Sequence, residues 1–245
     1  MIKLYGKDQK DPSPKVITYY HTDDGKATIG HWQKGKLYLV QINQRFDHME
    51  LVDDPDARHI AITDTDQVLI LDQSDYQPNK LEQYFSNIYS DDKKSSAINI
   101  KKSGQTIVYK SSSQSDIGPG QKATRHTLEG LISATSSDEQ TVILLVLRNQ
   151  IILGYINNGK LDHYKTIDKG DTMNIEYHTL AFYQENKISP EILLQHSGVK
   201  SGQEMSLSSY LPHLQMLKVP SSKLNYVVED HVELIPHYLA YSCVS

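Results

Sequence analysis

The hydrophobic positions of this chain fall into short runs separated by polar turns, and two groups of runs share one pattern. Both groups contain the sequence G-x4-G-K-L, at residues 30–37 and again 124 residues later at residues 154–161. In each group an apolar run precedes the motif and another follows it. Asp24-Gly25 in the first group and Asn158-Gly159 in the second suit the positive φ angles of tight hairpins. The pattern predicts two meanders of three strands, related by duplication; two unrelated hairpins of similar sequence are the alternative.

The two copies can be aligned strand by strand. We align Val16–Tyr20 with Val142–Val146 as the first strand of each meander. Leu37–Ile42 aligns with Leu161–Ile167 as the third strand. The glycine motif between them supplies the second strand and the turn that follows it.

The remaining segments read as a mixture of helices and strands. Apolar residues at 173, 177, 180, 181 and 183 predict an amphipathic helix over 171–186, with Asp171 or Thr172 as its N-cap. We expect further helices over 79–89, 121–134, 206–217 and 230–241; Pro212 should interrupt the third, and Pro236 should kink or restart the last. Further strands are expected at 59–63 and 68–71, which we pair with each other, near 97–101, at 105–110 and at 191–195.

Composition restricts the classes of function. The 245 residues are 38% hydrophobic and 22% charged, and 25 Lys and Arg against 30 Asp and Glu give a net charge of −5, which excludes a strongly basic surface for nucleic acid or anionic lipid. The single cysteine, Cys243, allows no internal disulfide and no zinc site with two cysteine ligands. Charges interrupt the first ten residues, and the most apolar stretch, 142–156, is too short to span a bilayer. We therefore expect a cytoplasmic protein without direct membrane insertion.

A meander followed by helix and strand, occurring twice and joined by a helix, resembles the superfamily of actin, heat-shock chaperone ATPases and sugar kinases, also called ribonuclease H-like. Residues 177–198 also resemble an actin-like family of Bacteroidetes. The segment 59–110 is similar to the strand-rich insertion of pilus-assembly PilM proteins and of the cytoplasmic domains of type II secretion L proteins. The resemblance covers residues 16–42 and 125–245. It implies an α/β fold with two mixed sheets: a first half over 15–120, which contains a small α+β insertion at 59–110, and a second half over 121–245.

The resemblance implies a nucleotide cleft between the halves, with phosphates held by the first hairpin of each half. In ATP-binding relatives an aspartate there holds Mg²⁺ or water, and a following glycine lets backbone N–H groups approach phosphate. The first hairpin keeps Asp24-Gly25, which any tight turn also favours, whereas the second, around Asn149, has neither acid nor glycine. The adenine-side loop, Ser197-Gly198, has one glycine where relatives have a pair. We therefore name these five residues as vestigial nucleotide-binding positions and expect no catalytic residue and no metal site.

Other motifs are incomplete. Residues 118–124 do not meet the phosphate-loop pattern, residues 195–199 lack the glycines of a nucleophile elbow, and the acidic pair Asp64 and Asp66 fits a hairpin turn. We predict a non-catalytic cytoplasmic module with a degenerate nucleotide cleft and no cofactor, which acts in protein interaction or scaffolding. Its protein partner is unidentified. Tyr76, Tyr84 and Tyr89 are candidate anchors, although for any single one of them a half-buried position at a sheet edge is the more frequent role.

Two alternatives remain open at this point. One is a nucleotide-dependent switch, an ATPase or kinase-like protein that uses ATP and Mg²⁺ with Asp24 positioning the metal. The other is a cytoplasmic component of a pilus or secretion-type envelope machine.

Overall fold

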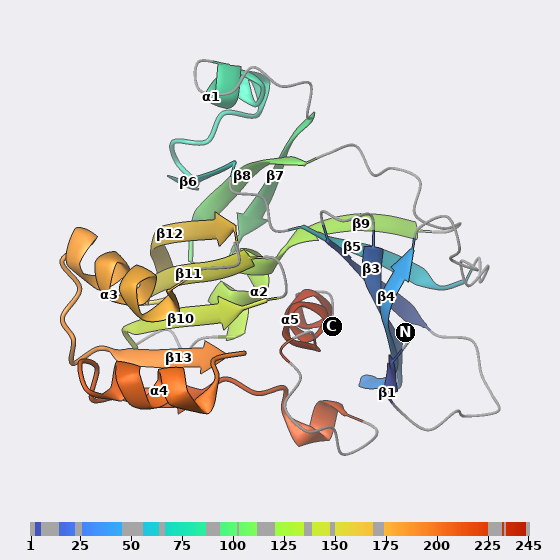
Figure 1. Ribbon diagram of the computed structural model, residues 1–245. Coiled ribbons are helices and arrows are strands. Elements are labelled where there is room, and N and C mark those ends of the chain that lie inside the picture. Colours follow the sequence, from blue (N-terminus) through green and yellow to red (C-terminus); the bar gives the residue numbers. More distant parts are fainter. Residues whose placement is uncertain are drawn as a thin grey trace.

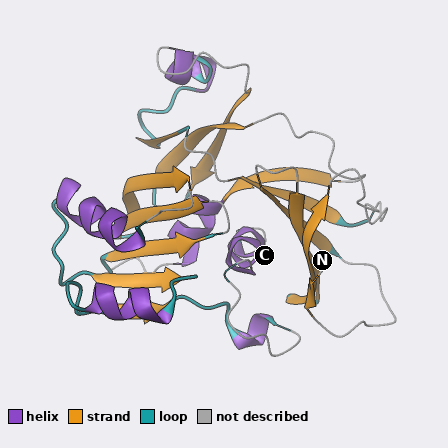
Figure 2. Cartoon of the chain, in the orientation of Figure 1, coloured by secondary structure: helices purple, strands orange, loops and turns teal. Residues whose placement is uncertain are grey.

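Two mixed β-sheets and a smaller antiparallel sheet surround a central C-terminal helix (Figure 1). The computed structural model describes residues 3–5, 15–22, 26–45, 56–63, 67–86, 94–101, 103–111, 121–134, 139–147, 150–168, 174–224, 232 and 234–243. Figure 2 shows that strands make up most of the regular structure. Along the sequence, most of the helices fall in the second half of the chain.

The first sheet has the strand order β1-β4-β3-β2-β5-β9. Its meander comprises β2 (Val16–Thr22), β3 (Lys26–Gln33) and β4 (Lys36–Arg45), which pair antiparallel. Strand β5 (Arg58–Thr63) then adds parallel to β2, and β9 (Gln121–His126) adds parallel to β5. The short strand β1 (Lys3–Tyr5) pairs with the outer edge of β4.

The second sheet repeats this topology. Its order is β12-β11-β10-β13-β14, with an antiparallel meander of β10 (Thr141–Val146), β11 (Gln150–Asn157) and β12 (Lys160–Asp168). Strand β13 (Leu193–Ser197) adds parallel to β10, and β14 (Leu214–Met216) adds parallel to β13. The expected α/β fold with two mixed sheets, each starting with a three-stranded meander, is confirmed.

The two glycine motifs form the same hairpin. Lys34-Gly35 and Asn158-Gly159 both have two successive positive φ angles, as a type I′ turn requires. The strand register also shifts at equivalent positions of the two hairpins. The shift lies between His31 and Trp32 in the first and between Tyr155 and Ile156 in the second. The first strands are aligned differently from our expectation. Val16 pairs with Trp32 as Thr141 pairs with Ile156, so Val16 corresponds to Thr141 and the sequence alignment with Val142 was out by one residue.

The small sheet has the order β6-β8-β7 and is formed by β6 (Val68–Asp72), β7 (Lys94–Ile100) and β8 (Gln105–Ser111). The predicted pairing of 59–63 with 68–71 is wrong, because β5 belongs to the first sheet and β6 pairs with β8. The predicted helix over 121–134 is also wrong in its first part: β9 occupies 121–126, and α2 (Thr127–Ala134) follows it. The expected boundary after residue 120 therefore separates β9 from the sheet in which it pairs.

The helices are shorter than their hydrophobic patterns predict. Helix α3 (Ile175–Glu185) begins at Asn174, whose side chain accepts a hydrogen bond from the Tyr177 N–H, so Asp171 and Thr172 are not its N-cap. Helix α4 (Ser201–Ser208) begins and ends earlier than the helix expected over 206–217, and strand β14 occupies part of the remaining segment. The segment 79–89 holds a 3₁₀ turn (Pro78–Lys80) and one turn of helix, α1 (Gln83–Ser86). Pro236 lies in the first turn of α5 (Leu234–Ser242), where its missing N–H disrupts no helical hydrogen bond.

The core has two main layers around the second sheet. Alternate side chains of β10 point to opposite faces: Val142 and Leu144 pack with residues of α3 and α4, whereas Ile143 and Leu145 pack with residues of α2 and α5. Helix α5 also contacts β2 and β5, so it lies between the two larger sheets (Figure 1). The α2–α5 crossing is close, because a Cβ on Gly130 would lie 2.4 Å from Leu239 Cβ.

Candidate functional site

The region expected to hold nucleotide lies beside the ends of β2 and β10, the strands that lead into the first hairpin of each half. Three of the five sequence-predicted positions, Asp24, Gly25 and Asn149, lie outside the residues that the structure describes. Ser197 and Gly198 lie at the end of β13, beside the end of β10. The flanking residues of both hairpins are described and define how the two halves meet there.

A side-chain hydrogen bond joins the two halves beside these hairpins. Tyr20, near the end of β2, is 4% exposed, and its hydroxyl oxygen accepts from Gln150 Nε2 at 3.1 Å. Gln150 is the first residue of β11, so the bond connects the strand before the first hairpin with the strand after the second. Sequence reasoning missed this pair. The one signal in the sequence is that a polar residue, Gln150, directly follows the second of these hairpins.

Gly198 is required by packing between two strand ends. Its φ is +80°, and an added Cβ would lie 2.3 Å from the Val146 carbonyl oxygen and 3.1 Å from Val232 Cγ2. Both facts exclude a side chain at this position. Its neighbour Ser197 is buried. Backbone packing therefore explains the glycine at position 198, where the resemblance implies an adenine-side loop, without any nucleotide.

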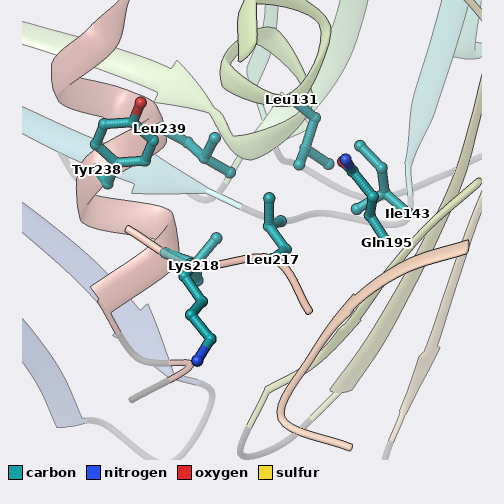
Figure 3. A pocket seen from close by; sticks show the side chains of 8 residues that line it. Leu131, Ile143, Gln195, Leu217, Lys218, Tyr238 and Leu239 are labelled. Atoms are coloured by element: carbon teal, nitrogen blue, oxygen red, sulfur yellow. The ribbon is translucent and has the colours of Figure 1, made fainter. Parts of the chain in front are cut away.

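A small cavity lies between α2, α5 and the second sheet (Figure 3). Its volume is about 30 Å³, and its lining side chains are mostly aliphatic: Leu131, Ile143, Leu217, Ile235 and Leu239, with Gln195, Lys218 and Tyr238. Figure 3 shows the Lys218 ammonium group extending away from the other lining side chains. The cavity is small, and its mostly aliphatic lining offers few polar partners to a ligand.

A buried polar cluster fixes α5 against the first sheet. Thr18 Oγ1 lies 2.7 Å from His237 Nδ1, accepts from Trp32 Nε1 at 3.1 Å and lies 3.2 Å from the Gly30 carbonyl oxygen. A hydroxyl has one donor and two acceptor sites, so all three contacts are satisfied if His237 carries its proton on Nδ1 and Thr18 donates to Gly30. Burial, with a smaller effect of His31, lowers the pKa of His237 to about 3. His237 is therefore neutral at pH 7.

A second buried histidine, His196, lies on strand β13. His196 is 1% exposed, and its Nε2 lies 3.5 Å from a Glu204 carboxylate oxygen on α4. Burial lowers the pKa of His196, and the charge of Glu204 and its hydrogen bond oppose that shift. The side chain faces α4 whereas its neighbour Ser197 faces the opposite side of the sheet, so the two do not form a nucleophile–base pair.

The remaining candidates have structural roles or lie outside the described residues. Tyr84 uses its hydroxyl to accept from the Gln77 N–H and to donate to the Asp75 carbonyl, and its ring stacks with that of Tyr76. Tyr89, Asp64 and Asp66 lie outside the described residues. Within the described ranges, no group of three His, Cys, Asp or Glu side chains could hold a metal ion. No helix in those ranges is long and apolar enough to cross a bilayer.

Comparison with known proteins gives the fold its context. The sequence matches none of the protein-family models and none of the curated proteins with which it was compared. It is similar in structure to a Bacteroides thetaiotaomicron protein of unknown function with an actin-like ATPase fold, at a TM-score of 0.68 and 10% identity over 92% of this chain and 95% of that chain. It is also similar to a chain of the PilM–PilN type IV pilus biogenesis complex, at a TM-score of 0.57 and 9% identity over 94% of this chain and 98% of that chain. With two sheets of matching topology and these two likenesses, the chain has the actin-like ATPase fold.

Proposed function

We propose that this chain is a non-catalytic actin-like module with a degenerate nucleotide cleft, which acts in the cytoplasm as a protein-interaction or scaffolding component. The observation that carries the proposal is the hydrogen bond between Tyr20 and Gln150. Two protein side chains meet beside the hairpins that hold phosphates in ATP-binding relatives. A phosphate group there would have to compete with a bond that is already formed within the chain.

The sequence of the second hairpin supports the same conclusion. Residues 147–149, Leu-Arg-Asn, offer neither a carboxylate for Mg²⁺ nor a glycine for close backbone approach. At the adenine side, Gly198 is held against Val146 by strand packing. The second hairpin therefore lacks the groups that a nucleotide site needs, and Gly198 is explained by packing, whereas the first hairpin keeps Asp24-Gly25 in its sequence.

Exposed apolar side chains favour a role in protein interaction. Tyr177, Met205 and Tyr210, on α3, on α4 and just after α4, are 65%, 74% and 61% exposed. Large apolar side chains of this kind are enriched where proteins bind one another. The PilM–PilN structure shows that a protein with a similar fold forms a complex with a partner protein.

Mg-ATP binding tests the proposal directly. The melting temperature of the purified chain is measured with and without millimolar Mg-ATP, beside an Asp24→Ala variant. Saturation at 100 times the dissociation constant would add about 2.7 kcal/mol and raise the melting temperature of a chain of this size by roughly 5–10 °C. We expect no rise in either protein. A rise of that size in the original chain that disappears in Asp24→Ala would overturn the proposal in favour of a nucleotide-driven switch.

The second candidate function is a cytoplasmic component of a pilus or secretion-type envelope machine, favoured by the likeness to the PilM–PilN complex. A photo-crosslinking residue in place of Tyr210 should then capture an inner-membrane protein in the host cell. The same residue in place of Tyr84, whose hydroxyl holds its own loop, is the control. Capture of soluble proteins alone at position 210 would contradict this candidate.

A further inference from the structure

We infer that the small sheet is a strap that locks the two halves in one fixed arrangement by holding the β11–β12 hairpin of the second half. By the strap we mean strands β6, β8 and β7. It is inserted in the first half, between β5 and β9, and it contacts the second half at the edge strand β12 (Figure 1). This inference does not depend on the proposed function, because a nucleotide-binding chain could carry the same strap.

The central contact is a pair of buried hydrogen bonds from one glutamine. Gln105, the first residue of β8, donates through Nε2 to the Leu161 carbonyl oxygen at 3.0 Å. Its Oε1 accepts from the Leu161 N–H at 2.9 Å. Gln105 is 6% exposed and Leu161 is 1% exposed. The side-chain amide therefore pairs with the peptide groups of Leu161 as a neighbouring strand would, and it satisfies this part of the edge of β12.

Apolar packing continues through the same contact. Ile107 and Tyr109 of the strap belong to one buried cluster with Ile156 and Leu161 of the hairpin. The ring of His126, at the end of β9, lies edge-on between Tyr109 and Tyr164, with centroid distances of 5.3 and 6.0 Å. The three sheets thus share one core at this junction, and separating the halves would expose it to water.

An ion pair lies beside the glutamine. Lys160 Nζ lies 3.0 Å from an Asp72 carboxylate oxygen, and both side chains are about half exposed. An exposed pair of this kind adds little stability, but it places two substitutable side chains across the contact.

The hairpin is held at its other end as well. Gln150, at the start of β11, binds Tyr20 of the first half, whereas Leu161 lies just beyond the turn at the end of β11. Both ends of the strand are therefore tied to the first half. A rotation of one half against the other would break buried hydrogen bonds at one end or the other, which fixes their relative arrangement.

Amide hydrogen exchange in a matched pair of variants tests the strap. Gln105→Met keeps the approximate side-chain length and removes both bonds to Leu161. Thr106→Val, at the next residue, removes a bond to Asn99 that lies within the strap. With β10 amides as the internal reference for global stability, we expect Leu161 exchange to accelerate roughly ten-fold or more in Gln105→Met and to stay within about two-fold in Thr106→Val. Equal protection of Leu161 in both variants would overturn the inference.

A crosslink tests the same point without removing a buried group. Asp72→Cys and Lys160→Cys are combined in a Cys243→Ser background and joined by a short bismaleimide. We expect complete crosslinking and an unchanged solution scattering profile, because the halves already hold this arrangement. A radius of gyration that falls on crosslinking, or a pair that does not react, would show that the halves separate in solution and would refute the strap.

Discussion

Acid should destabilise this protein strongly through His237, which is fully buried between α5 and the first sheet. Its pKa falls from 6.5 in an unfolded chain to about 3 in the fold, mainly through burial and further through His31. Between these two values the unfolded state binds a proton that the folded state does not. Stability contributed by the neutral ring is therefore intact above pH 6.5 and is lost as the pH falls towards 3.

The magnitude follows from this difference in pKa. From pH 7 to pH 5 the proton taken up by the unfolded chain at this one site lowers the free energy of unfolding by about 2 kcal/mol. The result hardly changes if the folded pKa is one unit higher, because the unfolded value of 6.5 controls the titration in this range. His196, whose pKa is also lowered, acts in the same direction.

Urea denaturation followed by the fluorescence of Trp32 measures this loss. The indole lies in the same cluster, bonded to Thr18 and stacked on Tyr241 with ring centroids 4.1 Å apart. In His237→Gln, which keeps a polar group near Thr18 but does not titrate, the loss between pH 7 and pH 5 should be smaller by about 2 kcal/mol. His213→Gln, at an exposed site, should lose as much as the original chain. Equal losses in the original chain and in His237→Gln would refute the reasoning.

Substitutions at three further positions have clear expected outcomes in the same denaturation assay. Gly130→Ala should destabilise by about 1–3 kcal/mol, because its Cβ would lie 2.4–2.8 Å from the Cβ, Cα and carbonyl carbon of Leu239, and backbone atoms cannot turn aside. Gly202→Ala, on α4 with open space around it, should stabilise by about 0.5–1 kcal/mol and is the control. A loss of stability at Gly202 as well would mean that the loss at Gly130 cannot be assigned to the contact with Leu239. Asn174→Ala should cost about 1 kcal/mol, because the Tyr177 N–H loses its capping partner, and Asn174→Asp should restore most of it.

The repeated meander could be predicted from the sequence because its turns depend on local stereochemistry. A type I′ turn needs two residues at positive φ, and the spacing of Gly35 and Gly159 after matching strands reveals both copies. The pairing of β5 and β9 could not be predicted in this way. Their partners lie far along the chain, and both strands are parallel, so no turn residue marks the register.

The candidate site was harder to predict for a related reason. Tyr20 and Gln150 are 130 residues apart, and neither residue type signals a contact. Gln105 and His237 are likewise polar residues that make their bonds only when distant strands and helices come together. Local patterns reveal turns and helix faces, whereas buried polar pairs between the halves emerge only from the assembled fold.

The two kinds of hairpin in this chain differ in how closely their two copies match. The β3–β4 and β11–β12 hairpins keep the same turn, the same register shift and the same glycine spacing. The sequences at the other hairpins differ, with Asp-Asp-Gly at 23–25 and Leu-Arg-Asn at 147–149. The first kind determines the shape of each sheet, and the second kind lies where the resemblance to actin-like proteins implies phosphate binding. A scaffolding protein needs the hairpins that shape its sheets but has no need of hairpins that bind phosphate, and this is the pattern that the proposed role predicts. The Gln105 contact supplies a way to hold the halves together without a nucleotide.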